Sequence, residues 1–208
     1  MMAQKDSLDL GGDNREIPLL YDKSRQFTGS ITTVYQLPLG YGDNFIGESL
    51  DGKDGLAFSF NLFLFRNFYL GANYGISNFE VTDKASLGNY EETQIEERHL
   101  TLGYELLPLK NIRLGLFTSL FGEATLTNEG QDVSNRDSGK LWIYGLRLEY
   151  EIVDNLSLLL VFDWRRIKTN INVPSEIRDF FETGTYNNLS FGLKFNFGKS
   201  DILKSIQL

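Results

Sequence analysis

Charged side chains recur at alternate positions within several apolar runs of this sequence. Between Lys140 and Val153, for example, Arg147 and Glu149 alternate with aliphatic and aromatic residues. Alternate residues of an extended strand share one face, so these charges would line one side of a sheet and the apolar residues the other. The candidate charged face contains Glu105, Arg113, Arg147, Glu149, Asp163, Arg165 and Lys194.

A charged face of this kind has two chemical interpretations. A buried charge without a partner costs several kcal/mol, so the favoured interpretation is a network of ion pairs that plugs the interior of a barrel. The alternative is a gated path for ions along the same charges. We expect Phe63, Phe65, Phe117, Leu159 and Val161 to face inward as well, which argues against an open pore.

The one histidine, His99, could act as a base beside a hydroxyl nucleophile. Lipid A deacylase barrels use a His-x-Ser pair with an acidic partner, and the nearest match here is His99-Leu100-Thr101. Thr replaces Ser, and the expected register directs both side chains inward, as it does Glu97 and Glu123 near the loop rim. We predict no catalytic residues and no cofactor, with a lipid-modifying enzyme as the alternative; a histidine-rich metal site is excluded.

Composition favours one β-rich domain. The 208 residues include 16 Phe, 10 Tyr and 20 Gly but only 4 Pro and no Cys, which removes disulfides and thiolate chemistry. The net charge of −8 makes nucleic acid an unsuitable partner. A run of about 18 apolar residues, which a transmembrane helix requires, is absent from the sequence, whereas a spanning strand needs only about 9–11 residues of alternating character.

Eight segments of alternating or β-rich character predict eight strands. The clearest are 140–153 and 189–197, where apolar residues alternate with polar residues or glycine, apart from exceptions such as Ile143 on the polar face. The alternation is weakest in the first segment, 27–37. The predicted strands are 27–37, 55–65, 68–81, 95–106, 112–126, 140–153, 156–168 and 189–197.

The predicted connections alternate between short and long. Three short turns at 66–67, 107–111 and 153–155 contain Asn or Asp, which tolerate the positive φ of a tight hairpin. Four long polar connections, rich in acidic residues, are expected at 38–54, 82–94, 128–139 and 169–185. They are interpreted as solvated loops, with divalent-cation bridging to lipopolysaccharide or weak Ca²⁺ binding as the alternative. An even strand number places both termini on the short-turn side.

Two kinds of barrel would show this alternation, a soluble one and a membrane-spanning one. The apolar face carries Phe, Tyr, Trp or Leu on nearly every strand, which would overpack the narrow interior of an eight-stranded barrel. Aromatic residues also gather near strand ends, with Trp142 and Trp164 toward the long loops and Tyr150 and Phe197 toward the short turns. Such girdles are typical of the two membrane interfaces, so we predict a transmembrane barrel.

The pattern over residues 27–197 resembles the small outer-membrane β-barrels typified by the OmpA transmembrane domain and OmpX. The turn style and the Phe-rich final strand FGLKFNFGK resemble those of barrels of the Bacteroidetes type. This resemblance implies a bacterial outer-membrane location, periplasmic termini, extracellular long loops, and lipid and lipopolysaccharide as surroundings. It implies a structural or interaction role without turnover.

The ends of the chain fall outside the predicted barrel. Residues 1–26 form an expected periplasmic extension and 198–208 a periplasmic tail, whereas barrels of this type often end at the terminal aromatic residue. In the tail, Ile202, Leu203 and Ile206 have near-helical spacing. The plain interpretation is disordered ends. The alternative is docking to other envelope proteins, as an accessory subunit of a secretion, assembly or uptake complex.

Overall fold

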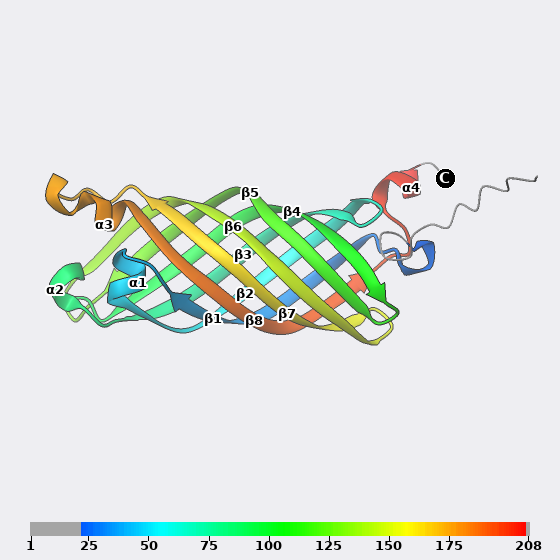
Figure 1. The fold of residues 1–208 in the computed structure, drawn as a ribbon, viewed down its shortest axis with the longest axis horizontal. Helices are drawn as coiled ribbons and strands as arrows, with labels where there is room; N and C mark the ends of the chain where they lie inside the picture. Colours follow the sequence, from blue (N-terminus) through cyan, green and yellow to red (C-terminus); the bar gives the residue numbers. More distant parts are fainter. Residues whose placement is uncertain (1–21, 207–208) are drawn as a thin grey trace, which may run out of the picture.

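The computed structural model describes residues 22–206, which form a closed antiparallel barrel of eight strands (Figure 1). Each strand pairs with its neighbours in the sequence, and the pairing of the first strand with the last closes the sheet. The predicted all-β fold, an eight-stranded up-and-down barrel, is confirmed. The strands are β1 (Gly29–Gly40), β2 (Leu50–Phe65), β3 (Phe68–Val81), β4 (Glu92–Leu109), β5 (Ile112–Glu129), β6 (Ser134–Val153), β7 (Leu156–Thr169) and β8 (Thr183–Phe197).

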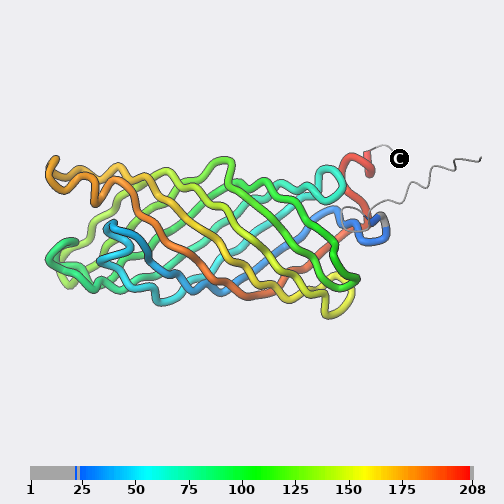
Figure 2. Tube along the Cα trace, in the orientation of Figure 1, coloured from blue at the N-terminus to red at the C-terminus, as the bar shows by residue number. Residues whose placement is uncertain are grey.

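Three two-residue turns lie at one end of the barrel, which we call the turn end. They are Arg66–Asn67, 110–111 and 154–155, and both Arg66 (φ 53°) and Asn155 (φ 69°) adopt positive φ, as tight hairpins require. The start of β1 and the end of β8 lie at this same end (Figure 2). Two short elements accompany them there, the 3-10 helix η1 (Lys23–Arg25) and the helix α4 (Ile202–Ile206).

The opposite, loop end carries four connections, three of which contain short helices. The β1–β2 connection holds α1 (Phe45–Ser49), the β3–β4 connection holds α2 (Lys84–Leu87), and the β7–β8 connection holds η2 (Ser175–Ile177) and α3 (Arg178–Glu182). The prediction of a long loop at 128–139 is wrong. Strand pairing continues up to Glu129 opposite Ser134, so only residues 130–133 connect β5 to β6.

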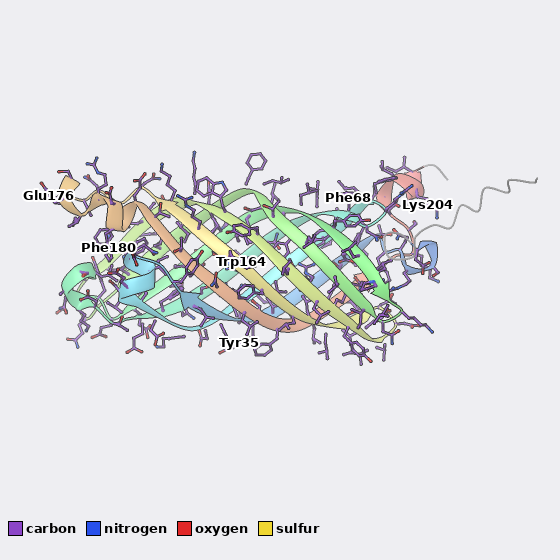
Figure 3. The ribbon with its side chains drawn as sticks, viewed as in Figure 1. Tyr35, Phe68, Trp164, Glu176, Phe180 and Lys204 are labelled. Carbon is purple, nitrogen blue, oxygen red and sulfur yellow. The ribbon has the colours of Figure 1, made fainter. Side chains whose placement is uncertain are left out.

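The strands extend farther toward the loop end than the alternation predicted. Strands β4 and β5 have 18 residues each and β6 has 20, about twice the length that crosses a membrane. Trp164 therefore lies about midway along the barrel, whereas Phe68 lies near the turn end (Figure 3). We divide the barrel at the level of Trp142 and Trp164 into a turn half and a loop half.

The polarity of the sheet differs between these two halves. In the turn half, the outward face is apolar, and its exposed residues include Phe58, Phe60, Leu102, Leu116, Leu146, Leu148, Leu160 and Phe191. In the loop half, it is the inward face that is apolar. Its buried core contains Phe79, Val81, Ile95, Ala124, Leu126, Leu141, Ile167 and Tyr186.

Irregularities in two strands overturn two predicted orientations. Four residues of β5, 119–122, lie opposite three residues of β6, and this bulge changes which side chains face inward. Ala124 is consequently buried and Glu123 is exposed, not inward as predicted. In β2, a register shift between Phe63 and Phe65 turns Phe65 outward, where it is 47% exposed, while Phe63 is buried as expected.

Candidate functional site

The lumen of the turn half is closed by a cluster of four charged side chains. The Lys194 ammonium lies 2.5 Å from Glu105 Oε1 and 2.6 Å from Glu149 Oε2, and all three side chains are essentially inaccessible to solvent. Arg113 lies farther away, at 3.5 Å from Glu105 and 3.7 Å from Glu149. Two acids and two bases balance in this Lys194 cluster, as burial of charge demands.

The register of the strands explains why these side chains meet. Arg113 of β5 is directly opposite Glu149 of β6, and Lys194 of β8 is directly opposite Ser157 of β7. The Ser157 hydroxyl donates to Glu149 Oε1 at 2.8 Å. Inward positions of four strands thus converge at one level of the narrow lumen, which side chains of this size fill.

Residues before β1 close the turn end below this cluster. Arg25 Nη1 donates to the Leu109 carbonyl at 2.7 Å, and the Arg25 carbonyl accepts from Arg113 Nη2 at 3.0 Å. The Arg113 guanidinium also lies 4.7 Å from the centre of the Phe27 ring. Burial lowers the pKa of Arg25 from its usual value, and the positive charge of Arg113 lowers it further. No pattern in the sequence predicted this closure.

A second cluster lies nearer the loop end. Arg165 Nε donates to Asp163 Oδ1 at 2.6 Å, and Arg165 also pairs with Glu97. The Tyr186 hydroxyl donates to the same Glu97 carboxylate. With two acids and one base, this Arg165 cluster has a formal charge of −1. The charged side chains predicted to form one network therefore form two separate clusters, the Lys194 cluster and the Arg165 cluster.

Arg147 lies between the two clusters and joins neither by an ion pair among residues 22–206. Its guanidinium lies 5.5 Å from the Tyr69 ring centre and 5.6 Å from that of Phe117, within the range of cation–π attraction. Both rings fit because glycines lie opposite them: a Cβ at Gly103 would clash with Tyr69, and one at Gly145 would lie 2.5 Å from Phe117. The positive charge of Arg147 balances the excess acid of the Arg165 cluster, so the eight charges of the two clusters and Arg147 sum to zero.

A small cavity adjoins Arg147. It measures about 50 Å³ and is also lined by Thr32, His99 and Ser190. This volume suits one or a few water molecules and is far below the roughly 300 Å³ or more of a ligand site.

The helix α1 seals the loop end. Its residues Phe45 and Ile46 are buried in the apolar core, and Phe45 stacks on Phe181 of α3 with ring centres 5.8 Å apart. The Asn44 side chain caps α1 by accepting from Ile46 N at 3.1 Å, and it also accepts from Thr185 N of β8 at 3.1 Å. The polar character of 38–54 predicted a loop here, although Asn followed by two apolar residues is a helix-start signal.

The structure places His99 and Thr101 on the inward face, as expected from the register. The Thr101 hydroxyl accepts from Asn73 Nδ2, and His99 Nδ1 has no hydrogen-bond partner within the described residues. The described part of the chain contains no group of three or more His, Cys, Asp or Glu residues placed to hold a metal ion. Within residues 22–206, no helix is long and apolar enough to cross a membrane.

Solved structures share this architecture. Neisserial surface protein A superposes with a TM-score of 0.59 at 8% identity, covering 82% of this chain and 97% of that one. The N-terminal β-barrel domain of Pseudomonas aeruginosa OprF gives a TM-score of 0.50 at 17% identity, covering 83% and 100%. This chain has the fold of the small outer-membrane β-barrels. No family model and no curated protein matches its sequence.

In a small outer-membrane barrel, aromatic residues concentrate at the two membrane interfaces. Trp142 is 44% exposed, and Trp164 stacks on Tyr144 with ring centres 5.4 Å apart. At the turn end, Tyr150 is 51% exposed and Phe197 stacks on Phe60 at 6.0 Å. The turn half of this barrel thus has an apolar outer band with aromatic residues at both edges.

The helix α4 extends from the turn end of the barrel. Leu203 is 52% exposed and Ile206 is 74% exposed, whereas Ile202 is partly buried. Asp201 caps the helix by accepting from Lys204 N at 2.9 Å and also accepts from Arg66 N at 2.9 Å, which ties α4 to the β2–β3 turn. Docking of a partner on α4 stays a prediction. Residues 1–21 of the expected N-terminal extension lie outside the described residues.

Proposed function

We propose that this protein is a non-enzymatic, non-conducting outer-membrane barrel that acts through its surfaces, in a structural or interaction role. The observation that carries the proposal is the lumen, which is occupied along its length. From the turn end, it holds Arg25 and Phe27, the Lys194 cluster, the Tyr69 and Phe117 rings, the Arg165 cluster and the apolar core below α1.

The proposed orientation puts the turn end in the periplasm and the loop end outside the cell. Short turns on the periplasmic side and longer loops outside are the usual arrangement of outer-membrane barrels. The loop half, with a polar outer surface, would then project from the membrane toward the exterior.

The absence of turnover in this proposal rests on the surroundings of His99. A lipid-modifying site must present its nucleophile and base to lipid, but here His99 and Thr101 both face the lumen. The Thr101 hydroxyl accepts a hydrogen bond from Asn73, and within residues 22–206 no hydrogen bond joins it to His99. This arrangement lacks the nucleophile–base contact that acyl transfer requires.

Conductance in planar lipid bilayers tests the proposal. We expect the purified protein to give no discrete conductance steps, because the two charge clusters and the lumen rings leave no continuous water path. The triple variant Tyr69→Ala, Phe117→Ala, Arg147→Ala widens only the middle of the lumen and leaves both charge clusters in place, so it should give no conductance steps either. Regular steps from the unmodified protein would contradict a sealed lumen.

A further inference from the structure

A groove lies on the outer surface of the barrel, at the boundary between the turn half and the loop half. Its volume is about 750 Å³, and it crosses β6, β7 and β8. Trp142, Trp164 and Tyr41 supply aromatic walls, and Thr183 and Thr185 supply hydroxyl groups. Trp164, labelled in Figure 3, marks its level along the barrel.

Basic side chains dominate the charge of this groove. Arg166 and Lys168 line it, and Lys140 lies directly opposite Lys168 in the β6–β7 pairing. All three are exposed. Like charges directly opposite each other in a sheet repel, so this pair costs stability unless an anion lies near it.

Acidic side chains within residues 22–206 neutralise these three basic residues only weakly. Lys168 lies 3.2 Å from Glu182, but both side chains are about half exposed, and such surface pairs contribute little. Lys140 also lies directly opposite the exposed Glu123 of β5, although neither Lys140 nor Arg166 forms an ion pair among residues 22–206. By contrast, the outward Arg98 on β4 pairs with Glu96 and lies 6.0 Å from the centre of the Tyr74 ring.

The concentration of positive charge is local. The chain as a whole has a net charge of −8, so three exposed basic residues beside two tryptophans are not a consequence of overall composition. Tryptophan prefers the headgroup level of a membrane, and basic pockets at that level bind the anionic head groups of lipids.

We propose that this groove binds the phosphorylated sugar of lipid A, the membrane-embedded part of lipopolysaccharide. A phosphate would lie between Lys140, Arg166 and Lys168, and the sugar ring would pack against Trp142 and Trp164. The acyl chains would continue from Tyr144, which lines the groove, down the apolar face over Phe162 and Leu146. The inference rests on the proposed orientation, because lipid A occupies the outer leaflet only.

Intrinsic fluorescence gives a direct test, because the two tryptophans of the chain, Trp142 and Trp164, both line the groove. The purified barrel in detergent micelles is titrated with bisphosphorylated lipid A, with chemically dephosphorylated lipid A, with phosphatidylglycerol and with inorganic phosphate. We expect saturable quenching or a spectral shift with bisphosphorylated lipid A alone. A response of equal affinity to the other three would overturn the proposal, since it would indicate general lipid or anion contact.

The decisive variant is Lys140→Gln, Arg166→Gln, Lys168→Gln. Each basic residue beside an anionic lipid surface contributes about fivefold in affinity, so the triple variant should bind lipid A about 100-fold more weakly. The matched control Lys53→Gln, Arg98→Gln removes outward basic residues elsewhere and should bind as the unmodified protein does. Unchanged binding by the triple variant, with its folding verified by circular dichroism, would overturn the site.

This outcome is separable from the proposed function. A lumen that conducts would refute the sealed barrel without affecting the fluorescence titration. Conversely, if lipid A does not bind, the unmodified protein should still give no conductance steps in planar bilayers.

Discussion

The two halves of this barrel use one continuous sheet with opposite polarity. In the turn half, charges such as Lys194 and Glu149 face the lumen, and leucines and phenylalanines face outward. In the loop half, Phe79 and Leu126 face the lumen, and Lys140, Arg166 and Lys168 face outward. The backbone geometry is shared, so the difference reflects the surroundings: lipid favours an apolar exterior, and water favours a polar one.

The bulge at residues 119–122 of β5 makes this inversion compatible with the sequence. Below it, odd-numbered residues such as Arg113 and Phe117 face the lumen, and above it the even-numbered Ala124 and Leu126 do so. Without the extra residue, Glu123 would enter the apolar core and Leu126 would face water, because a shift of one residue exchanges the two faces of a strand.

The largest expected effect comes from the charge cluster of the turn half. Lys194→Met leaves Glu105 and Glu149 facing each other with only the more distant Arg113 to compensate them. Removing one partner from a buried charge cluster costs about 3–5 kcal/mol of unfolding free energy. Guanidinium-induced unfolding in detergent micelles, followed by tryptophan fluorescence, measures the loss.

The control for this variant is Lys53→Met. Lys53 pairs with Glu92 at 2.8 Å, but the two side chains are 46% and 60% exposed. An exposed pair contributes about 0–1 kcal/mol, so the control should unfold almost as the unmodified protein does. Equal losses in the two variants would show that the lumen is hydrated enough to screen its charges.

In the loop half, removing buried side-chain volume from the inward face should lower the free energy of unfolding. Leu126 is 1% exposed within the apolar core, so Leu126→Ala removes buried methyl groups and creates a cavity. The expected cost is about 2–5 kcal/mol, and the same denaturant titration measures it. A cost below about 1 kcal/mol would indicate that this core is loosely packed and that the loop half derives its stability from strand pairing.

The sequence predicted the turn half more completely than the loop half. Between Lys140 and Val153, the alternation identified both faces, because one face is apolar throughout the spanning length. Residues 134–139 are all polar or Gly, so no alternation revealed that β6 starts at Ser134. The strand forms there because its backbone pairs with β5, and backbone pairing leaves no mark on side-chain type.

The sequence also could not predict which inward side chains meet each other across the lumen. Alternation assigned Arg147 and Arg165 to the same face, but whether each finds an acid depends on how far each strand is displaced along its neighbours. Arg165 meets Glu97 of β4 across the lumen, whereas Arg147 meets the rings of Tyr69 and Phe117. The closure by Arg25 and the bulge of β5 likewise depend on contacts between segments distant in the sequence.

Substitutions on the outward faces should have the smallest effects on stability, but they compare the two halves most directly. Leu146 lies midway between Trp142 and Tyr150 on β6 and is 48% exposed, and Ser138 is an exposed outward residue of the same strand in the loop half. Leu146→Arg should cost about 2–4 kcal/mol in lipid vesicles, because an arginine at the centre of the lipid face loses its hydration.

Ser138→Arg introduces the same charge into a surface that already faces water. We expect its effect to lie within about 0.5 kcal/mol, as for ordinary surface substitutions. Urea-induced unfolding from vesicles measures both variants under one condition. If the two cost the same, the boundary at Trp142 and Trp164 does not mark the edge of the membrane, and the lipid-facing band must be sought at another level of the barrel.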